Sequence, residues 1–168
     1  MQWNWRGKAW VFGDDVPNDN GFMPISFVRS QVYDAAVLAR SAFADLDPTL
    51  APKIAPGDIL VGGKNFGRGN PHVQGFLGLK GLGVGVLAES MSRGPLRACV
   101  NAGVPVLVAP TLREFAQNGD LLAVNFETGL VANETRGTSL QLPPLHDLMR
   151  AIIGAGGGLE FSKRRLGL

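Results

Sequence analysis

Residues 67–72, with the sequence GRGNPH, place three side chains of chemical interest at alternate positions. Arg68 carries a permanent positive charge, Asn70 an amide, and His72 an imidazole, which can donate or accept a proton. Gly67 and Gly69 tolerate backbone angles that other residues resist, so that consecutive N–H groups can turn toward one point. These residue types fit a site for an anion such as a carboxylate or a phosphate.

The same segment has the residues of a helix start. Asn70 suits the N-cap and Pro71 suits the first helical position, where a missing N–H costs nothing. A helix N-terminus that faces outward favours an anion, but an ordinary strand-to-helix turn explains the spacing equally well, and the sequence leaves both open. No Gly-Lys-Ser/Thr follows, so the loop is no Walker loop, and nucleotide binding is a weak alternative.

The loop belongs to an alternation of short apolar strands and helices. We expect strands at 8–12, 57–63, 83–89 and 104–110, with helices at about 71–82 and 91–102. This order predicts an α/β fold with a mixed, partly parallel sheet and flanking helices. We also expect short strands at 121–126, 129–134 and 138–142, and helices at about 31–44 and 143–153. No repeat or linker divides residues 1–168, which predicts a single domain.

Glycines recur at every third position of the helix expected at 71–82. Gly75, Gly78 and Gly81 form a stripe that predicts close packing on the sheet and no contact with a ligand. His146, just before the last expected helix, is predicted to be a surface or capping residue. The basic residues at 162–168 are predicted to form a solvated tail.

The composition excludes several classes of function. Sixteen basic and 14 acidic residues are too balanced to indicate a nucleic-acid or membrane surface. The single cysteine, Cys99, excludes an internal disulfide and cannot alone hold zinc or an iron–sulfur cluster. No apolar run has the length of a signal peptide core or a membrane span. We therefore expect a cytoplasmic protein that binds no metal itself.

Several ordered segments resemble a known family. They are GKAWVFGDDVPND, MPISFV, DLDP, KIAPGDILVGGKNFGRG, GVGVLAESMSRGPLRACVNAG and VPVLVAP, which together span roughly residues 7–110. The chain resembles the small subunit of 3-isopropylmalate dehydratase, which is similar to the swivelling domain of aconitases. The resemblance implies an aconitase-like swivelling β/β/α domain. It also implies a large-subunit partner that carries a [4Fe-4S] cluster, and a small-molecule hydroxy di- or tricarboxylate as substrate.

The chain departs from this family in the loop at 67–72. The family has Ser-Ser-Arg-Glu-His after its Gly-x-Gly, with a serine as catalytic base and the arginine as a clamp on a substrate carboxylate. This chain has Asn70, Pro71 and His72 at the first three positions. Neither an amide nor a proline supplies a hydroxyl to deprotonate. His72, with Asn70 beside it, is therefore a candidate catalytic residue, and a filler residue at a helix start is an equally open interpretation.

Other positions match the family's pattern. Lys64 matches its KNFG segment, Arg93 an arginine of the following helix, and Asp19 the aspartate of its Thr-Asp pair. Arg29 lies where the family has a mobile loop associated with substrate choice. With Arg68 and Gly69 of the loop, the resemblance makes these residues candidates for substrate binding. Arg93 and Arg97 lie four residues apart, so pairing with acidic neighbours is the alternative.

Three hypotheses of different classes follow. The first is a small subunit that completes the active site of a cluster-bearing large subunit, in a hydro-lyase or isomerase whose substrate differs from isopropylmalate. The second is a non-catalytic relative that keeps the fold and the docking surface as a regulatory or assembly partner. The third is an independent anion-binding domain, which the loop alone permits.

Overall fold

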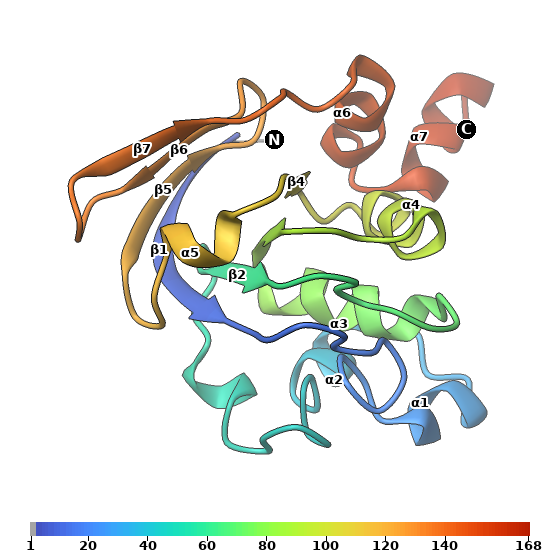
Figure 1. Ribbon diagram of the computed structural model, residues 1–168. Helices are drawn as coiled ribbons and strands as arrows, with labels where there is room; N and C mark the ends of the chain where they lie inside the picture. Colours follow the sequence, from blue (N-terminus) through green and yellow to red (C-terminus); the bar gives the residue numbers. More distant parts are fainter. Residues whose placement is uncertain (1–2) are drawn as a thin grey trace.

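The computed structural model describes residues 3–168. Its strands form one mixed sheet in the order β4-β3-β2-β1-β5-β6-β7 (Figure 1). The strands are β1 (Asn4–Val11), β2 (Ile59–Gly62), β3 (Gly85–Ala88), β4 (Val106–Val108), β5 (Leu121–Asn125), β6 (Leu130–Asn133) and β7 (Thr138–Gln141). Every strand expected from the sequence is present, with shorter bounds for most. The mixed α/β class is confirmed.

Strand β1 joins a parallel half of the sheet to an antiparallel half. Its residues 9–11 pair with β2 in parallel, in the register Ala9↔Ile59, and β3 and β4 continue the parallel half. Its residues 4–8 pair with β5 in antiparallel fashion, and β6 and β7 extend this half. The antiparallel half curls away from the parallel half (Figure 1). Because β1 to β4 run in parallel, the loops that follow them gather at one edge.

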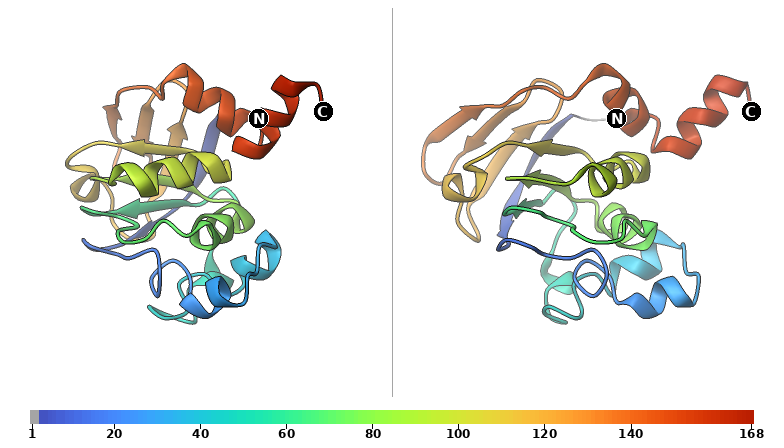
Figure 2. Two further views of the ribbon diagram at one scale, coloured as in Figure 1. Left: turned by 90° about the vertical axis from the view of Figure 1, so that its right-hand side faces the viewer. Right: turned by 45° about the vertical axis from the view of Figure 1, so that its right-hand side comes forward.

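Helices α3 (Val73–Leu82) and α4 (Arg93–Ala102) connect the parallel strands and lie side by side (Figure 2). Both confirm helices expected from the sequence, and α6 (Asp147–Gly154) confirms a third. The shorter helical segments are α1 (Ile25–Arg29), α2 (Ala35–Ala39), η1 (Ala51–Lys53) and α5 (Leu112–Phe115).

The long helix expected at 31–44 is wrong. Within that range only α2 is helical, and it begins after Asp34, whose side chain accepts a hydrogen bond from the N–H of Val37. Gln31 and Phe43 have φ angles of 53° and 63°, in the left-handed region that ends a right-handed helix. The apolar periodicity in this range reflects burial of Phe43 and Leu38 from separate turns.

Residues 162–168, expected to form a solvated tail, are largely helical in the structure. Helix α7 (Gly158–Leu166) includes most of these residues and projects from the body of the protein (Figure 2). Lys163, Arg164 and Arg165 occupy its last turn, where positive charge is favourable near the negative end of the helix dipole. None of the helix's residues is buried, so the expected solvent exposure is confirmed while the lack of structure is not.

A cluster of phenylalanines lies below the loops at the carboxyl edge of the parallel strands. The rings of Phe22 and Phe66 are 4.8 Å apart, and Phe22 is 5.7 Å from Phe76. Phe12 and Phe43 stack at 4.9 Å. Phe22 and Phe66 belong to the loops after β1 and β2, so that burial of their rings fixes both loops on the core.

The glycine stripe of α3 permits close packing, as expected, but its partners are not the sheet. A Cβ at Gly81 would overlap the carbonyl oxygen of Ala35, in α2. A Cβ at Gly78 would lie 2.6 Å from Cε of Met23, and one at Gly75 would overlap Oδ1 of Asn18. The stripe therefore brings α3 against α2 and the loop after β1.

Candidate active site

The loops after β1 and β2 are bound to each other along their length. The N–H of Gly67 donates to the carbonyl of Val16, at 2.8 Å, and the N–H of Asn18 donates to the carbonyl of Arg68, at 2.9 Å. On the other side, the N–H of Phe66 donates to the carbonyl of Ser90 after β3, at 2.9 Å. Residues 63–70 are thus held between two neighbouring loops.

Gly67 and Gly69 adopt the conformations expected of them. Their φ angles are 75° and 95°, in the region that disfavours side chains. A Cβ at Gly67 would lie 2.9 Å from Cε2 of Phe22, whereas one at Gly69 would meet nothing within 4 Å. Gly67 is therefore needed for both backbone and packing, and Gly69 for its backbone angle on an open face.

The helix start expected at Asn70 and Pro71 is wrong by two residues. Helix α3 begins at Val73, and His72 occupies the N-cap with an extended ψ of 134°. The N–H of His72 donates to the carbonyl of Asn70 in a tight turn, at 2.9 Å. This turn leaves Pro71 outside the helix and brings the side chain of His72 to the helix N-terminus.

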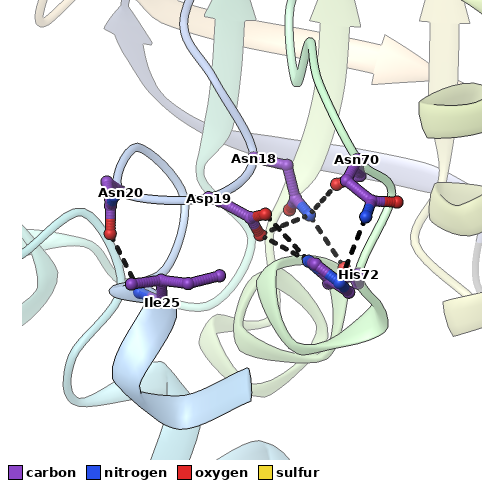
Figure 3. Close-up of polar contacts among 6 residues, drawn as sticks. All are labelled: Asn18, Asp19, Asn20, Ile25, Asn70 and His72. Carbon is purple, nitrogen blue, oxygen red and sulfur yellow. Dashed lines mark hydrogen bonds and ion pairs between the residues drawn. The ribbon is translucent and has the colours of Figure 1, made fainter. Parts of the chain in front are cut away.

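The side chain of Asn18 holds the turn at residues 70–72 in place. Its side-chain Nδ2 donates to the carbonyl oxygens of Asn70 and His72, at 2.9 Å each (Figure 3). Asn18 is 1% exposed, and its Oδ1, buried against Gly75, has no hydrogen-bond donor among residues 3–168. The sequence analysis missed Asn18, since an asparagine in a Pro-Asn-Asp-Asn turn has the ordinary explanation of local turn geometry.

Both ring nitrogens of His72 have a partner. Nδ1 lies 2.8 Å from Oδ2 and 3.0 Å from Oδ1 of Asp19, and Nε2 lies 3.3 Å from Nδ2 of Asn70. The side chains of Asp19 and Asn70 point toward the ring from the loops after β1 and β2 (Figure 3). With 33% of His72 and 24% of Asp19 exposed, the group is neither sealed nor fully solvated.

Arg68 turns away from this group. Its Nε donates to the carbonyl of Asp15, at 2.9 Å, and lies 4.0 Å from the carboxylate of the same residue. The structure therefore brings Asn70, His72 and Asp19 together, whereas the guanidinium of Arg68 lies beside Asp15, with 60% of its side chain exposed.

Lys64 contributes to a pocket at the same edge of the sheet. The pocket has a volume of about 460 Å³, and its other charged lining residues are Glu89, Arg113 and Glu114. Arg113 pairs with Asp14, at 2.8 Å. Within residues 3–168 the ammonium of Lys64 forms no ion pair, so its charge is available to a ligand.

The remaining candidate residues lie apart from His72 in the sequence and are exposed. Arg29 is the last residue of α1, a short helix at a place where the family resemblance implied a loop. At the start of this helix, the side chain of Asn20 accepts a hydrogen bond from the N–H of Ile25, at 3.0 Å. Arg93 begins α4. In the described part of the chain, neither Arg93 nor Arg97 forms an ion pair, so the predicted alternative of pairing with acidic neighbours is wrong.

His146 has the capping role expected for it. Its Nδ1 accepts a hydrogen bond from the N–H of Leu148 at the start of α6, at 3.2 Å.

Within the described range, no three His, Cys, Asp or Glu side chains lie close enough to hold a metal ion. No helix of the described chain has the length and apolar character needed to span a membrane.

Relatives of known classification match the chain over nearly its full length. It is 37% identical to the isopropylmalate/citramalate isomerase small subunit of Methanocaldococcus jannaschii over 163 residues, which cover 96% of this chain and 95% of the relative. It is 41% identical to the 3-isopropylmalate dehydratase small subunit of Pyrobaculum calidifontis over 162 residues, which cover 95% of this chain and 98% of the relative. The chain belongs to the 3-isopropylmalate dehydratase small-subunit family.

A solved structure of this family has the same fold. The crystal structure of 3-isopropylmalate dehydratase from Methanocaldococcus jannaschii matches with a TM-score of 0.88 at 28% identity, covering 97% of this chain and 95% of that one. No protein-family model matches the sequence. The resemblance and the aconitase swivel-type fold predicted from the sequence are confirmed, and the chain is a small subunit of the dehydratase type.

Proposed function

We propose that this small subunit completes the active site of a hydro-lyase or isomerase whose large subunit carries a [4Fe-4S] cluster. The observation that carries the proposal is the match to small subunits along 95–98% of both chains. One of these relatives is named for isopropylmalate and citramalate, which are both hydroxy dicarboxylates. The substrate proposed for this chain is accordingly a hydroxy di- or tricarboxylate in the cytoplasm.

The cluster is assigned to the partner because this chain has a single cysteine. Its single cysteine, Cys99, is fully buried, and burial raises the pKa of its thiol well above the ordinary value. A cluster requires several thiolates that can reach one point. When bound by the partner, the cluster would supply a Lewis-acidic iron that polarises the leaving hydroxyl. Every group proposed below belongs to this chain.

Positive groups at the carboxyl edge are the proposed contacts for substrate carboxylates. Lys64 and Arg68 are exposed in the loop after β2, Arg93 follows β3, and Arg29 lies on the helix tied to the loop after β1. Gly69, with open space around its Cα, allows a substrate to approach the backbone of the loop. Each guanidinium can bind a carboxylate with two parallel hydrogen bonds.

His72, assisted by Asn70, is the proposed proton-transfer group. In dehydration a C–H bond breaks, its proton moves to Nε2, and its electron pair forms the new double bond as hydroxide leaves with its own bonding pair. The hydroxide takes up a proton from its surroundings, and Nε2 later releases its proton, so that one water is lost overall. Such general base catalysis contributes roughly 10²- to 10⁴-fold to a rate.

Co-expression with a family large subunit tests the proposal. The two chains are purified together under anaerobic conditions, and hydration of a panel of unsaturated di- and tricarboxylates is assayed. A stable complex that turns over one of the panel supports the proposal. A stable, cluster-loaded complex that turns over none of it would favour the non-catalytic relative, and failure to form a complex would favour an independent anion-binding domain.

A further inference from the structure

The protonation pattern of His72 follows from its two neighbours. An ionised carboxylate can only accept hydrogen bonds, so the contact of Nδ1 with Asp19, at 2.8 Å, requires a proton on Nδ1. In the neutral ring, Nε2 is then the nitrogen with a lone pair. The amide Nδ2 of Asn70, 3.3 Å from Nε2, is a donor and matches this assignment.

The carboxylate of Asp19 is itself held in place. Its backbone forms a bridge with Met23, and the next residue, Asn20, has a φ of 59° and binds the start of α1 through its side chain. The amide of Asn18 lies 3.4 Å from Oδ1 of Asp19 while it binds the carbonyl of His72. One buried amide thus binds both the carboxylate of Asp19 and the backbone of His72.

We infer that Asp19 is a positioning residue, which holds His72 in the Nδ1–H tautomer and leaves Nε2 as the basic nitrogen. The role of Nε2 in turnover rests on the proposed function, whereas the tautomer does not. Because Asp19 faces Nδ1, its negative charge also balances the positive charge that the ring gains when Nε2 accepts a proton.

The amide of Asn70 can present either a donor or an acceptor to Nε2 of His72, according to whether that nitrogen carries a proton. Its side chain is exposed, and a half-turn of the amide replaces the Nδ2 donor with the Oδ1 acceptor. The neutral ring is then matched by the amide N–H groups and the protonated ring by the amide oxygen. Asp19 fixes one side of the imidazole in both states, and Asn70 adapts on the other.

The tautomer can be read directly in the full chain by NMR. Long-range ¹H–¹⁵N correlation spectra, recorded at a pH of about 8.5 where free imidazole is neutral, distinguish protonated from unprotonated ring nitrogens. His146 serves as an internal contrast because its Nδ1 accepts from the N–H of Leu148, which places its proton on Nε2. We expect the two histidines to be opposite tautomers, with Nδ1–H at His72.

Asp19→Asn replaces a group that can only accept with one that can also donate to Nδ1. The Nε2–H tautomer of His72 should then become populated, and turnover of the complex should fall roughly 10²- to 10⁴-fold with KM changed far less. Asp15→Asn is the matched control: it makes the same change in the same loop, where Asp15 contacts Asn65 and Arg68, and should leave the tautomer of His72 unchanged.

A wild-type His72 with its proton on Nε2 would overturn the inference, as would an unchanged tautomer in Asp19→Asn. Turnover of Asp19→Asn within twofold of wild type would overturn the positioning role in the reaction. If the wild-type tautomer is Nδ1–H but a cluster-loaded complex has no turnover, the pairing of Asp19 with His72 is supported and the proposed function fails.

Discussion

His72 acquires its orientation from residues that are distant in the sequence. Asp19 lies 53 positions away, and Asn18, which binds the carbonyl of His72, lies 54 positions away. The contact with Asp19 supplies a negative charge at Nδ1, and the amide of the nearby Asn70 lies 3.3 Å from Nε2. A histidine that merely filled a helix start would need neither contact.

Gly75→Ala tests how strictly Asn18 must fit beneath the turn. The added Cβ would overlap Oδ1 of Asn18 and lie 3.1 Å from Cβ of Phe22, both of which are buried. We expect a loss of about 1–3 kcal/mol in the free energy of unfolding, measured with urea, and an altered NMR signal of His72.

Gly154→Ala in α6 is the matched control for this change. Its Cβ would meet only Cζ2 of Trp3, at 3.6 Å, which is ordinary contact. The control should raise stability by roughly 0.5–1 kcal/mol, since alanine favours a helix. Equal effects of the two substitutions would contradict the packing described for Gly75.

At the residue scale, the sequence predicted the backbone of the loop better than the contacts of its side chains. The positive φ angles of Gly67 and Gly69 could be predicted because glycine favours such angles in a loop between a strand and a helix. His72 remains a predicted catalytic residue, singled out by the departure from the family's motif. The pairing of His72 with Asp19 could not, because no local pattern joins loops that become neighbours only when β1 and β2 pair in parallel. The orientation of Arg68 toward Asp15 was missed for the same reason.

The elements show where periodicity is a sound guide. Helices α3 and α4 and the strands of the parallel half were predictable because each is a continuous apolar or amphipathic run between turn residues. The range 31–44 has the same periodicity, but residues with left-handed backbone angles, Gln31 and Phe43, lie near its two ends, and between them only Ala35–Ala39 is helical. Backbone angles of that kind are favoured by glycine, asparagine, aspartate and histidine, so a glutamine and a phenylalanine give no sign of them.

Asp120, just before β5, tests how much the hydrogen bonds at this end of the antiparallel half contribute to stability. It accepts hydrogen bonds from the N–H of Gln117 and the side chains of Asn133 and Arg136, and these hold the pKa of its carboxyl below the ordinary value. A lowered folded-state pKa gives stability that is present above about pH 4 and lost as the pH falls through that lower pKa.

Asp120→Asn should therefore unfold more readily than wild type at pH 7, by about 1–3 kcal/mol, and lose less further stability between pH 4 and pH 2. Urea midpoints across this range measure both effects. Asp45→Asn is the control because Asp45 is exposed and forms no hydrogen bond or ion pair with the residues that the structure describes. The same acid response in Asp120→Asn and wild type would contradict the account.

For the molecule as a whole, the parallel half of the sheet presents the candidate site, and the antiparallel half adds buried residues such as Val124 and Val131 to the core. The loops after β1, β2, β3 and β4 share one edge, whereas α7 projects from a different part of the surface (Figure 2). The proposed large subunit should therefore cover the carboxyl edge, where Lys64, Arg68 and His72 lie.

Hydrogen exchange of the free and the assembled small subunit tests this orientation. Amides in residues 63–72 and 89–93 should exchange more slowly in the complex, because the partner excludes water from them. Those in the exposed helix α7 should not change. Protection confined to α7, with none at the carboxyl edge, would show that the partner binds another face.

The most direct measurement of the central claim is the turnover of a cluster-loaded complex that contains His72→Ala, compared with wild type on the best carboxylate of the panel. His146→Ala is the matched control, since His146 caps α6 away from the site. The account predicts a loss of roughly 10²- to 10⁴-fold for His72→Ala and nearly full turnover for the control. Turnover of His72→Ala within twofold of wild type would contradict the claim that this histidine transfers the proton.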